Sequence, residues 1–166
     1  MTMTMRQLGN ETTTVFPEGT DLVWERVFDA PREILWKALT EADRVARWWG
    51  PRKYETEVVA LDVRVGGTWR FINRNEDGEH PFTGTFLEIA PPDHFTWTFV
   101  YDVVPFNQGE PGTETFTLED LGGGRTKLAS RSHFPSVEVL EAQIAVGMIE
   151  GGIESWDRLA EELARS

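Results

Sequence analysis

Four glutamates of this chain carry carboxyl groups that could act as acids or bases: Glu88, Glu114, Glu150 and Glu154. A carboxyl group removed from water has a raised pKa, which suits it to general acid–base catalysis near neutral pH. The chain has 28 acidic residues, so surface placement explains most of them and is the ordinary expectation for each. Glu150 and Glu154 are the best candidates, because they flank a glycine pair and a side chain there could reach inward.

Other catalytic chemistries find little support in the sequence. The absence of cysteine excludes thiolate nucleophiles, disulfides and cysteine-based metal sites. The three histidines, His80, His94 and His133, do not have the spacing of metal ligands. The serine-hydrolase, zinc-protease and phosphate-loop motifs are also absent. We therefore expect no metal and no cofactor, and a binding protein rather than an enzyme.

Length, charge and hydropathy narrow the class of protein further. A chain of 166 residues with 40% apolar content is typical of one domain, which we place at residues 20–166. Residues 1–19 are polar, rich in threonine and without periodicity, so we expect a tail or an arm. The net charge of −12 argues against nucleic acid as a partner. Without a signal-peptide pattern or a long apolar run, we expect a cytoplasmic protein that does not insert into membranes.

Hydrophobic periodicity predicts the elements that would position these groups. A strand at residues 21–28 is followed by two short helices, of which the second ends at Gly50-Pro51. About six strands then follow between residues 54 and 134, joined by short turns, which favours an antiparallel meander. The alternation of Phe95, Trp97, Phe99 and Tyr101 with smaller residues is its clearest signal.

The chain ends in a helical pattern that runs from Ser136 to Ala164. Ser136 is placed to cap it. Gly151 and Gly152 each cost about 1 kcal/mol relative to alanine inside a helix, so either another element approaches closely there or space is left beside them. We predict an α+β fold in which a curved antiparallel sheet of about six to seven strands wraps around one long C-terminal helix.

The inner faces of that sheet and helix are where a ligand would bind. Strand parity places Ser130 and Ser132 inward, whereas a bulge would put Arg131 and His133 inside. Large rings facing two glycines favour a cavity wall, with plain core packing as the alternative. The predicted ligand-binding residues are Trp49, Trp69, Phe71, Phe86, Phe95, Trp97, Phe99, Tyr101, Ser130, Ser132, Met148, Gly151, Gly152 and Trp156.

Several short motifs in this order resemble a known superfamily. They are Phe28-Asp29-Ala30-Pro31 before a helix with Trp36, Trp48-Trp49-Gly50-Pro51, Asp62-x-Arg64-x-Gly66-Gly67, Gly84 to Glu88 before Pro91-Pro92, Thr126-Lys127-Leu128, and Trp156 after the glycine pair. The chain is similar in these motifs to the SRPBCC, or START-like, superfamily. Within it, the resemblance is to the branch named after the activator of the heat-shock-protein-90 ATPase, and it covers about residues 22–163.

This resemblance implies the helix-grip fold, with a cavity between the sheet and the last helix. Members of the superfamily bind lipids, sterols, hormones or polyketides there, and some are enzymes. Here the glycine pair precedes Trp156 by four to five positions instead of adjoining it, so we expect a differently shaped cavity end. The namesake co-chaperone also needs a further N-terminal domain, so we do not expect ATPase activation.

Three functional hypotheses follow from the residues and the resemblance. The first is the binding of a small hydrophobic molecule such as a lipid, a polyketide or an aromatic compound. The second is an enzyme of the lyase, cyclase or hydrolase type, which a desolvated carboxyl group or histidine on the cavity wall would favour. The third is a stress- or chaperone-linked interaction protein that uses the outer sheet face or a homodimer interface. A filled core with no cavity would favour this hypothesis and contradict the first two.

Overall fold

The computed structural model describes residues 6–165 as an eight-stranded antiparallel sheet with four helices. Its helices are α1 (Arg32–Thr40), α2 (Ala42–Trp48), α3 (Val137–Ala145) and α4 (Met148–Ala164). Its strands are β1 (Thr14–Glu18), β2 (Asp21–Phe28), β3 (Glu55–Leu61), β4 (Thr68–Asn75), β5 (Gly78–Ala90), β6 (His94–Tyr101), β7 (Gly112–Gly122) and β8 (Arg125–His133). The order across the sheet is β1-β2-β8-β7-β6-β5-β4-β3.

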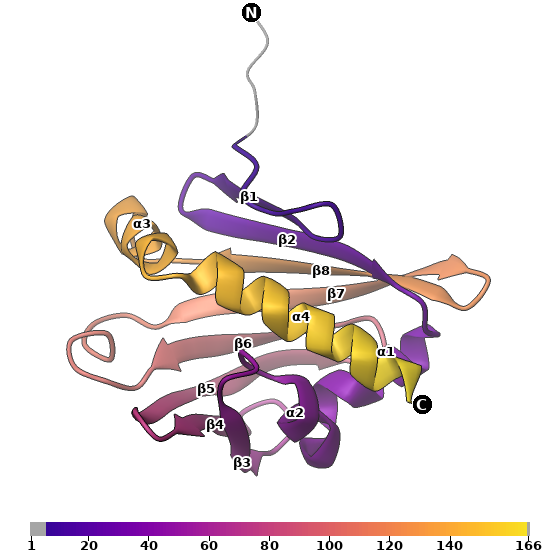
Figure 1. Ribbon diagram of the computed structural model, residues 1–166, viewed down its shortest axis with the longest axis horizontal. Helices are drawn as coiled ribbons and strands as arrows, with labels where there is room; N and C mark the ends of the chain where they lie inside the picture. The colour runs from indigo at the N-terminus through magenta and orange to yellow at the C-terminus, as the bar shows by residue number, and fades with distance from the viewer. Residues whose placement is uncertain (1–5, 166) are drawn as a thin grey trace, which may run out of the picture.

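The sheet curves around α4, which lies across its inner face (Figure 1). Strands β3 to β8 form an antiparallel meander of neighbouring hairpins. Strand β2 extends the sheet by pairing with β8. The two short helices after β2 lie beside α4 at one end of the sheet, whereas α3 lies at the other end (Figure 1). The predicted α+β class, the antiparallel meander and the two short helices after a strand are confirmed.

Alternation of side chains explains which face α4 covers. Along β4, Trp69, Phe71 and Asn73 are buried while the residues between them are more exposed, as expected for a half-buried strand. On α4, Trp156, Leu159 and Leu163 recur at helical spacing and are buried against this face. The core of the protein is therefore the layer between the inner face of the sheet and α4.

The strand count is higher than the six to seven predicted. The additional strand is β1, which lies within the segment where we expected a tail or an arm. Its Val15 is completely buried, and the side chain of Gln7 accepts a hydrogen bond of 2.8 Å from the Val15 amide. A five-residue strand flanked by threonines has too little alternation to be recognised before its partner β2 is known.

The prediction of one long C-terminal helix is wrong, because α3 and α4 are separate helices. Gly147 lies between them with φ of 91°, a left-handed conformation that ends a right-handed helix. The predicted start is confirmed: the Ser136 hydroxyl accepts a hydrogen bond of 3.2 Å from the Val139 amide. Glycine is tolerated within helices, so its αL conformation here could not be read from the periodic pattern.

The structure decides between the two explanations of the glycine pair. A Cβ atom on Gly152 would lie 2.4 Å from the Trp24 ring, far closer than real Cβ contacts. A Cβ on Gly151 would lie 3.4 Å from the Pro51 side chain, an ordinary van der Waals distance. Gly152 is therefore the point where α4 and β2 approach too closely for a side chain, and the gap we considered does not exist there.

Candidate functional site

Aromatic rings line the inner face of β4, β5 and β6 and form one continuous network. Trp69 and Trp97 stack with ring centroids 4.1 Å apart. Trp49, from the loop after α2, meets Phe71 edge-on at 5.1 Å and Phe82 at 5.0 Å. The predicted inward-facing rings thus come together, with Trp69, Phe71, Phe86, Phe95 and Trp97 buried and Trp49, Phe99 and Tyr101 partly exposed.

Two of the helix residues predicted for the same site, Gly152 and Trp156, contact β2 instead. Trp156 packs on Trp24 and Phe28 of β2, with centroid distances of 5.6 and 6.0 Å. Gly152 also meets Trp24, as described above. We expected Met148, Gly152 and Trp156 to face the rings of β6. For Gly152 and Trp156 this is wrong, because α4 makes their contacts on the β2 side of the sheet.

A small cavity lies between the ring wall and the two short helices. Its volume is about 20 Å³, which is room for about one water molecule. It is lined by Leu39, Val45, Trp48, Trp49, Phe71, Phe95, Trp97 and Phe116. An organic ligand would therefore enter this part of the core only by displacing rings from their present positions.

Next to this wall lies a carboxyl group, that of Glu114 on β7. Its Oε1 accepts a hydrogen bond of 2.9 Å from the indole N–H of Trp97. Its Oε2 accepts hydrogen bonds from the hydroxyls of Ser132, at 2.8 Å, and Ser130, at 3.4 Å. Burial raises the pKa of Glu114, and the three hydrogen bonds oppose this effect without cancelling it.

Sheet register brings these four side chains together. Glu114 is opposite Trp97 on β6 and opposite Ser132 on β8, and all three side chains point to the inner face. The predicted inward orientation of Ser130 and Ser132 is confirmed, since both are buried. The alternative parity is excluded, because Arg131 and His133 are exposed and both pair with Asp21.

Glu114 is the glutamate that the structure singles out, and the preference for Glu150 and Glu154 was wrong. Glu150 is exposed, and Glu154 accepts a hydrogen bond from the Arg52 amide. Glu88 is exposed and pairs with His94. The sequence did contain a signal for Glu114, which is in phase with the buried Phe116 and Leu118 along β7.

Within residues 6–165, no group of acidic, histidine or cysteine side chains is arranged to hold a metal ion. No helix of that same region has the length and hydropathy needed to cross a membrane.

Comparison with known proteins identifies the group to which this architecture belongs. The sequence profile described as "Activator of Hsp90 ATPase homolog 1-like protein" matches residues 29–164. No curated protein matches the chain significantly. Among solved structures, proteins from Rhodobacter sphaeroides and Arthrobacter aurescens both superpose with a TM-score of 0.83, at 26% and 23% identity.

Both superpositions cover nearly the whole of each chain. They include 93% of this chain and 99% of the Rhodobacter protein, and 92% and 91% for the Arthrobacter protein. A protein from Silicibacter pomeroyi named AHSA1 superposes with a TM-score of 0.71 at 23% identity, over 87% of this chain and 97% of its own. The shared fold thus includes most of this chain.

Proposed function

We propose that this chain, which belongs to the family of activator of Hsp90 ATPase homolog 1-like proteins, binds a small hydrophobic aromatic molecule between its sheet and α4. The observation that carries the proposal is the aromatic wall on β4 to β6, where the Trp97 ring stacks on Trp69, with the hydroxyls of Ser130 and Ser132 and the carboxyl group of Glu114 beside it. Removing a carboxyl group from water costs free energy unless hydrogen bonds or a ligand compensate for it. Burial raises the pKa of Glu114 despite its three hydrogen bonds, which fits a carboxyl group with room for a further partner.

The surroundings of Glu114 indicate the chemical class of the ligand. Flat rings on β4 to β6 favour a flat apolar molecule, which can stack on or meet them edge-on. A carboxyl group can accept a hydrogen bond from a hydroxyl when ionised, or donate one to a carbonyl when protonated. Ligand pockets commonly combine such an apolar wall with a few polar groups that fix orientation. Phenols and aromatic ketones meet both requirements.

Binding requires the ring wall to open, since the present cavity of about 20 Å³ cannot hold such a molecule. The rings of Phe99 and Tyr101 on β6 are partly exposed, unlike Phe95 and Trp97 on the same strand. These two partly exposed rings lie where β6 ends and β7 begins. We propose that the ligand enters from this end and reaches Glu114 by displacing partly exposed rings before fully buried ones.

Calorimetric titration with stilbene and para-hydroxystilbene tests the proposal. The two molecules have the same apolar body, so their difference in affinity isolates the hydroxyl group. We expect the wild-type protein to bind para-hydroxystilbene about five- to tenfold more tightly, because one hydrogen bond contributes about 1 kcal/mol. The Glu114→Leu variant should lose this preference while still binding stilbene. Equal affinities in the wild-type protein, or no binding of either, would contradict the proposal.

The same carboxyl group favours a second candidate, an acid–base enzyme. A desolvated glutamate with a raised pKa is a suitable proton donor or acceptor. The Glu114→Gln variant separates the two functions, because glutamine keeps a hydrogen-bonding side chain of the same shape but cannot exchange a proton. Chromatography of each bound compound after incubation would show conversion by the wild-type protein and none by the variant if the chain is an enzyme. Binding without conversion by either protein would favour the first function.

A further inference from the structure

A second polar pair lies on the inner face of the sheet, on the far side of the ring wall from Glu114. His80 of β5 and Tyr101 of β6 are joined by a hydrogen bond of 2.6 Å between Nδ1 and the phenolic oxygen. Both are partly buried. Register places them on the inner face, since His80 is opposite the buried Asn73 and Tyr101 is opposite Phe82.

Both residues of this pair can make a further hydrogen bond. Within residues 6–165, Nε2 of His80 has no hydrogen-bond partner. The Tyr101 hydroxyl can make a further hydrogen bond besides the one to His80, whichever group is the donor. Burial and the neighbouring Tyr54 raise the pKa of Tyr101, so the phenol stays protonated at neutral pH. The pair thus offers both a donor and an acceptor to a third group.

Aromatic rings line the inner face of the sheet between the two polar sites. Phe99 lies between Trp97 and Tyr101 on the inner face of β6 and contacts Trp69 at 5.8 Å and Phe82 at 5.7 Å. Phe82 in turn stacks on Tyr101 at 5.0 Å. The Cα atoms of Glu114 and Tyr101 are about 14 Å apart, from four residues of strand rise and one strand spacing. A rod-shaped aromatic molecule would span this distance.

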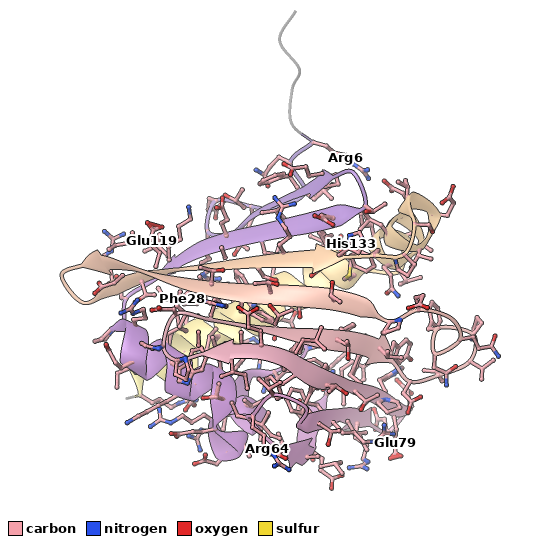
Figure 2. The ribbon with its side chains drawn as sticks, turned by 180° about the vertical axis from the view of Figure 1, so that it is seen from behind. Arg6, Phe28, Arg64, Glu79, Glu119 and His133 are labelled. Atoms are coloured by element: carbon pink, nitrogen blue, oxygen red, sulfur yellow. The ribbon has the colours of Figure 1, made fainter. Side chains whose placement is uncertain are left out.

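The pair is also near the open end of the sheet. Tyr101 is the last residue of β6 and contacts Phe106 in the following loop, which is 44% exposed. Glu79, the neighbour of His80, lies at the same end of the sheet as His133, opposite the end that carries Glu119 (Figure 2). A ligand that reaches Glu114 from this end would therefore still extend to His80 and Tyr101.

We infer that His80 and Tyr101 form a second polar subsite, so that the ligand is an elongated aromatic molecule with a polar group at each end. The inner end is held by Glu114 and the outer end by the His80–Tyr101 pair, with the rings of Phe82 and Phe99 along its length. This inference rests on the proposed function, because it assigns the second contact of the same ligand. It narrows the ligand class from simple phenols to elongated diphenols and similar aromatic compounds with a polar group at each end.

Titrations with para-hydroxystilbene and para,para′-dihydroxystilbene test the inference. The second hydroxyl adds one hydrogen bond, so we expect the diphenol to bind the wild-type protein about five- to tenfold more tightly. Tyr101→Phe keeps the ring and removes the hydroxyl, so it should reduce this preference to nearly one. Tyr54→Phe is the matched control and should retain it, since Tyr54 contacts His80 through its ring, with centroids 5.1 Å apart. His80→Leu should lose the preference as well, which provides a second variant if Tyr101→Phe folds poorly.

The outcomes separate the two proposals. Equal affinity of both phenols for the wild-type protein, with tighter binding than stilbene, would overturn the second subsite and leave the proposed function standing. A loss of preference in Tyr54→Phe as large as in Tyr101→Phe would overturn the assignment to this pair. Absence of binding by all three stilbenes would overturn both proposals.

Discussion

The indole N–H of Trp97 donates a 2.9 Å hydrogen bond to the carboxyl group of Glu114, and the two residues are direct partners across β6 and β7. This relationship links the aromatic wall to the polar site, because the ring of Trp97 also stacks on Trp69. A ligand that displaces Trp97 would therefore change the hydrogen bonding of Glu114.

Glu114 should make the protein less stable as pH rises. Its pKa is raised in the folded state, so the folded protein binds the proton more tightly than the unfolded chain. The stabilisation that this provides is fully present below the unfolded pKa, about 4.3, and is lost as pH rises through the folded pKa.

Chemical denaturation gives the free energy of unfolding of the wild-type protein and of Glu114→Gln as a function of pH. The difference between the two proteins isolates Glu114, because the contributions of the other carboxyl groups cancel. The wild-type protein should gain stability relative to the variant as the solution is acidified. A difference between the two proteins that stays constant with pH would show that Glu114 titrates normally.

Replacing Glu114 by leucine should also destabilise the fold at neutral pH. The change leaves the Trp97 indole N–H and the Ser132 hydroxyl without their partner, and an unsatisfied buried polar group costs about 1–3 kcal/mol. Glu114→Gln keeps an acceptor and should cost less. Urea denaturation compares the two variants, and equal stabilities would indicate that these hydrogen bonds contribute nothing measurable.

The two helix glycines should respond oppositely to alanine. Gly152→Ala places a methyl group against the buried ring of Trp24, and overpacking of this kind costs about 1–3 kcal/mol. Gly151→Ala meets Pro51 at an ordinary distance and should be neutral or stabilise α4 by up to about 1 kcal/mol. Thermal unfolding of both variants provides the comparison. A stable Gly152→Ala protein would mean that Trp24 has room to move.

Glu162 should be a stabilising carboxylate rather than a functional one. It is buried on α4, and its two oxygens accept hydrogen bonds of 2.9 Å from Arg47 of α2, with Arg165 also within 3.0 Å. The hydrogen bond from Arg47 lowers its pKa despite the opposing effect of burial, so its contribution is present above the unfolded pKa and is lost as pH falls.

Glu162→Gln should therefore destabilise the protein by about 1.5–3 kcal/mol at pH 7, since hydrogen bonds to charged groups are among the stronger ones. The cost should shrink in acid. Glu161→Gln is the control, because Glu161 is half-exposed and pairs with the exposed Arg52. Equal costs for the two variants would show that the contact between α2 and α4 is no stronger than a surface ion pair.

The sequence predicted those parts of the fold that depend on long periodic patterns. The alternation along β6 and the helical spacing of Trp156, Leu159 and Leu163 placed both elements with the correct inner faces. The separation of α3 from α4 was missed, since Gly147 has a left-handed conformation that only the surrounding chain specifies. The strand β1 was missed for a related reason, because it is defined by its pairing with β2.

The site was predicted in part. Parity along β8 correctly placed Ser130 and Ser132 inward, and their partner Glu114 was among four candidates but ranked below the wrong pair. The reason is that Glu114, Trp97 and Ser132 come from three strands, and their meeting depends on register rather than on sequence spacing. The contact of Gly152 with Trp24 likewise joins residues 128 positions apart and has no local signature.

The most direct test of ligand binding at Glu114 is a ¹H–¹⁵N spectrum of the tryptophan indole groups during titration with para-hydroxystilbene. The indole N–H of Trp97 reports on Glu114 directly, whereas Trp156 packs against β2 and serves as an internal control. We predict a saturable shift of the Trp97 signal. In Glu114→Leu, which keeps the apolar contacts but not the hydrogen bond, half-saturation should need an about five- to tenfold higher concentration of the phenol. A saturable shift of Trp156 with an unchanged Trp97 signal would contradict it.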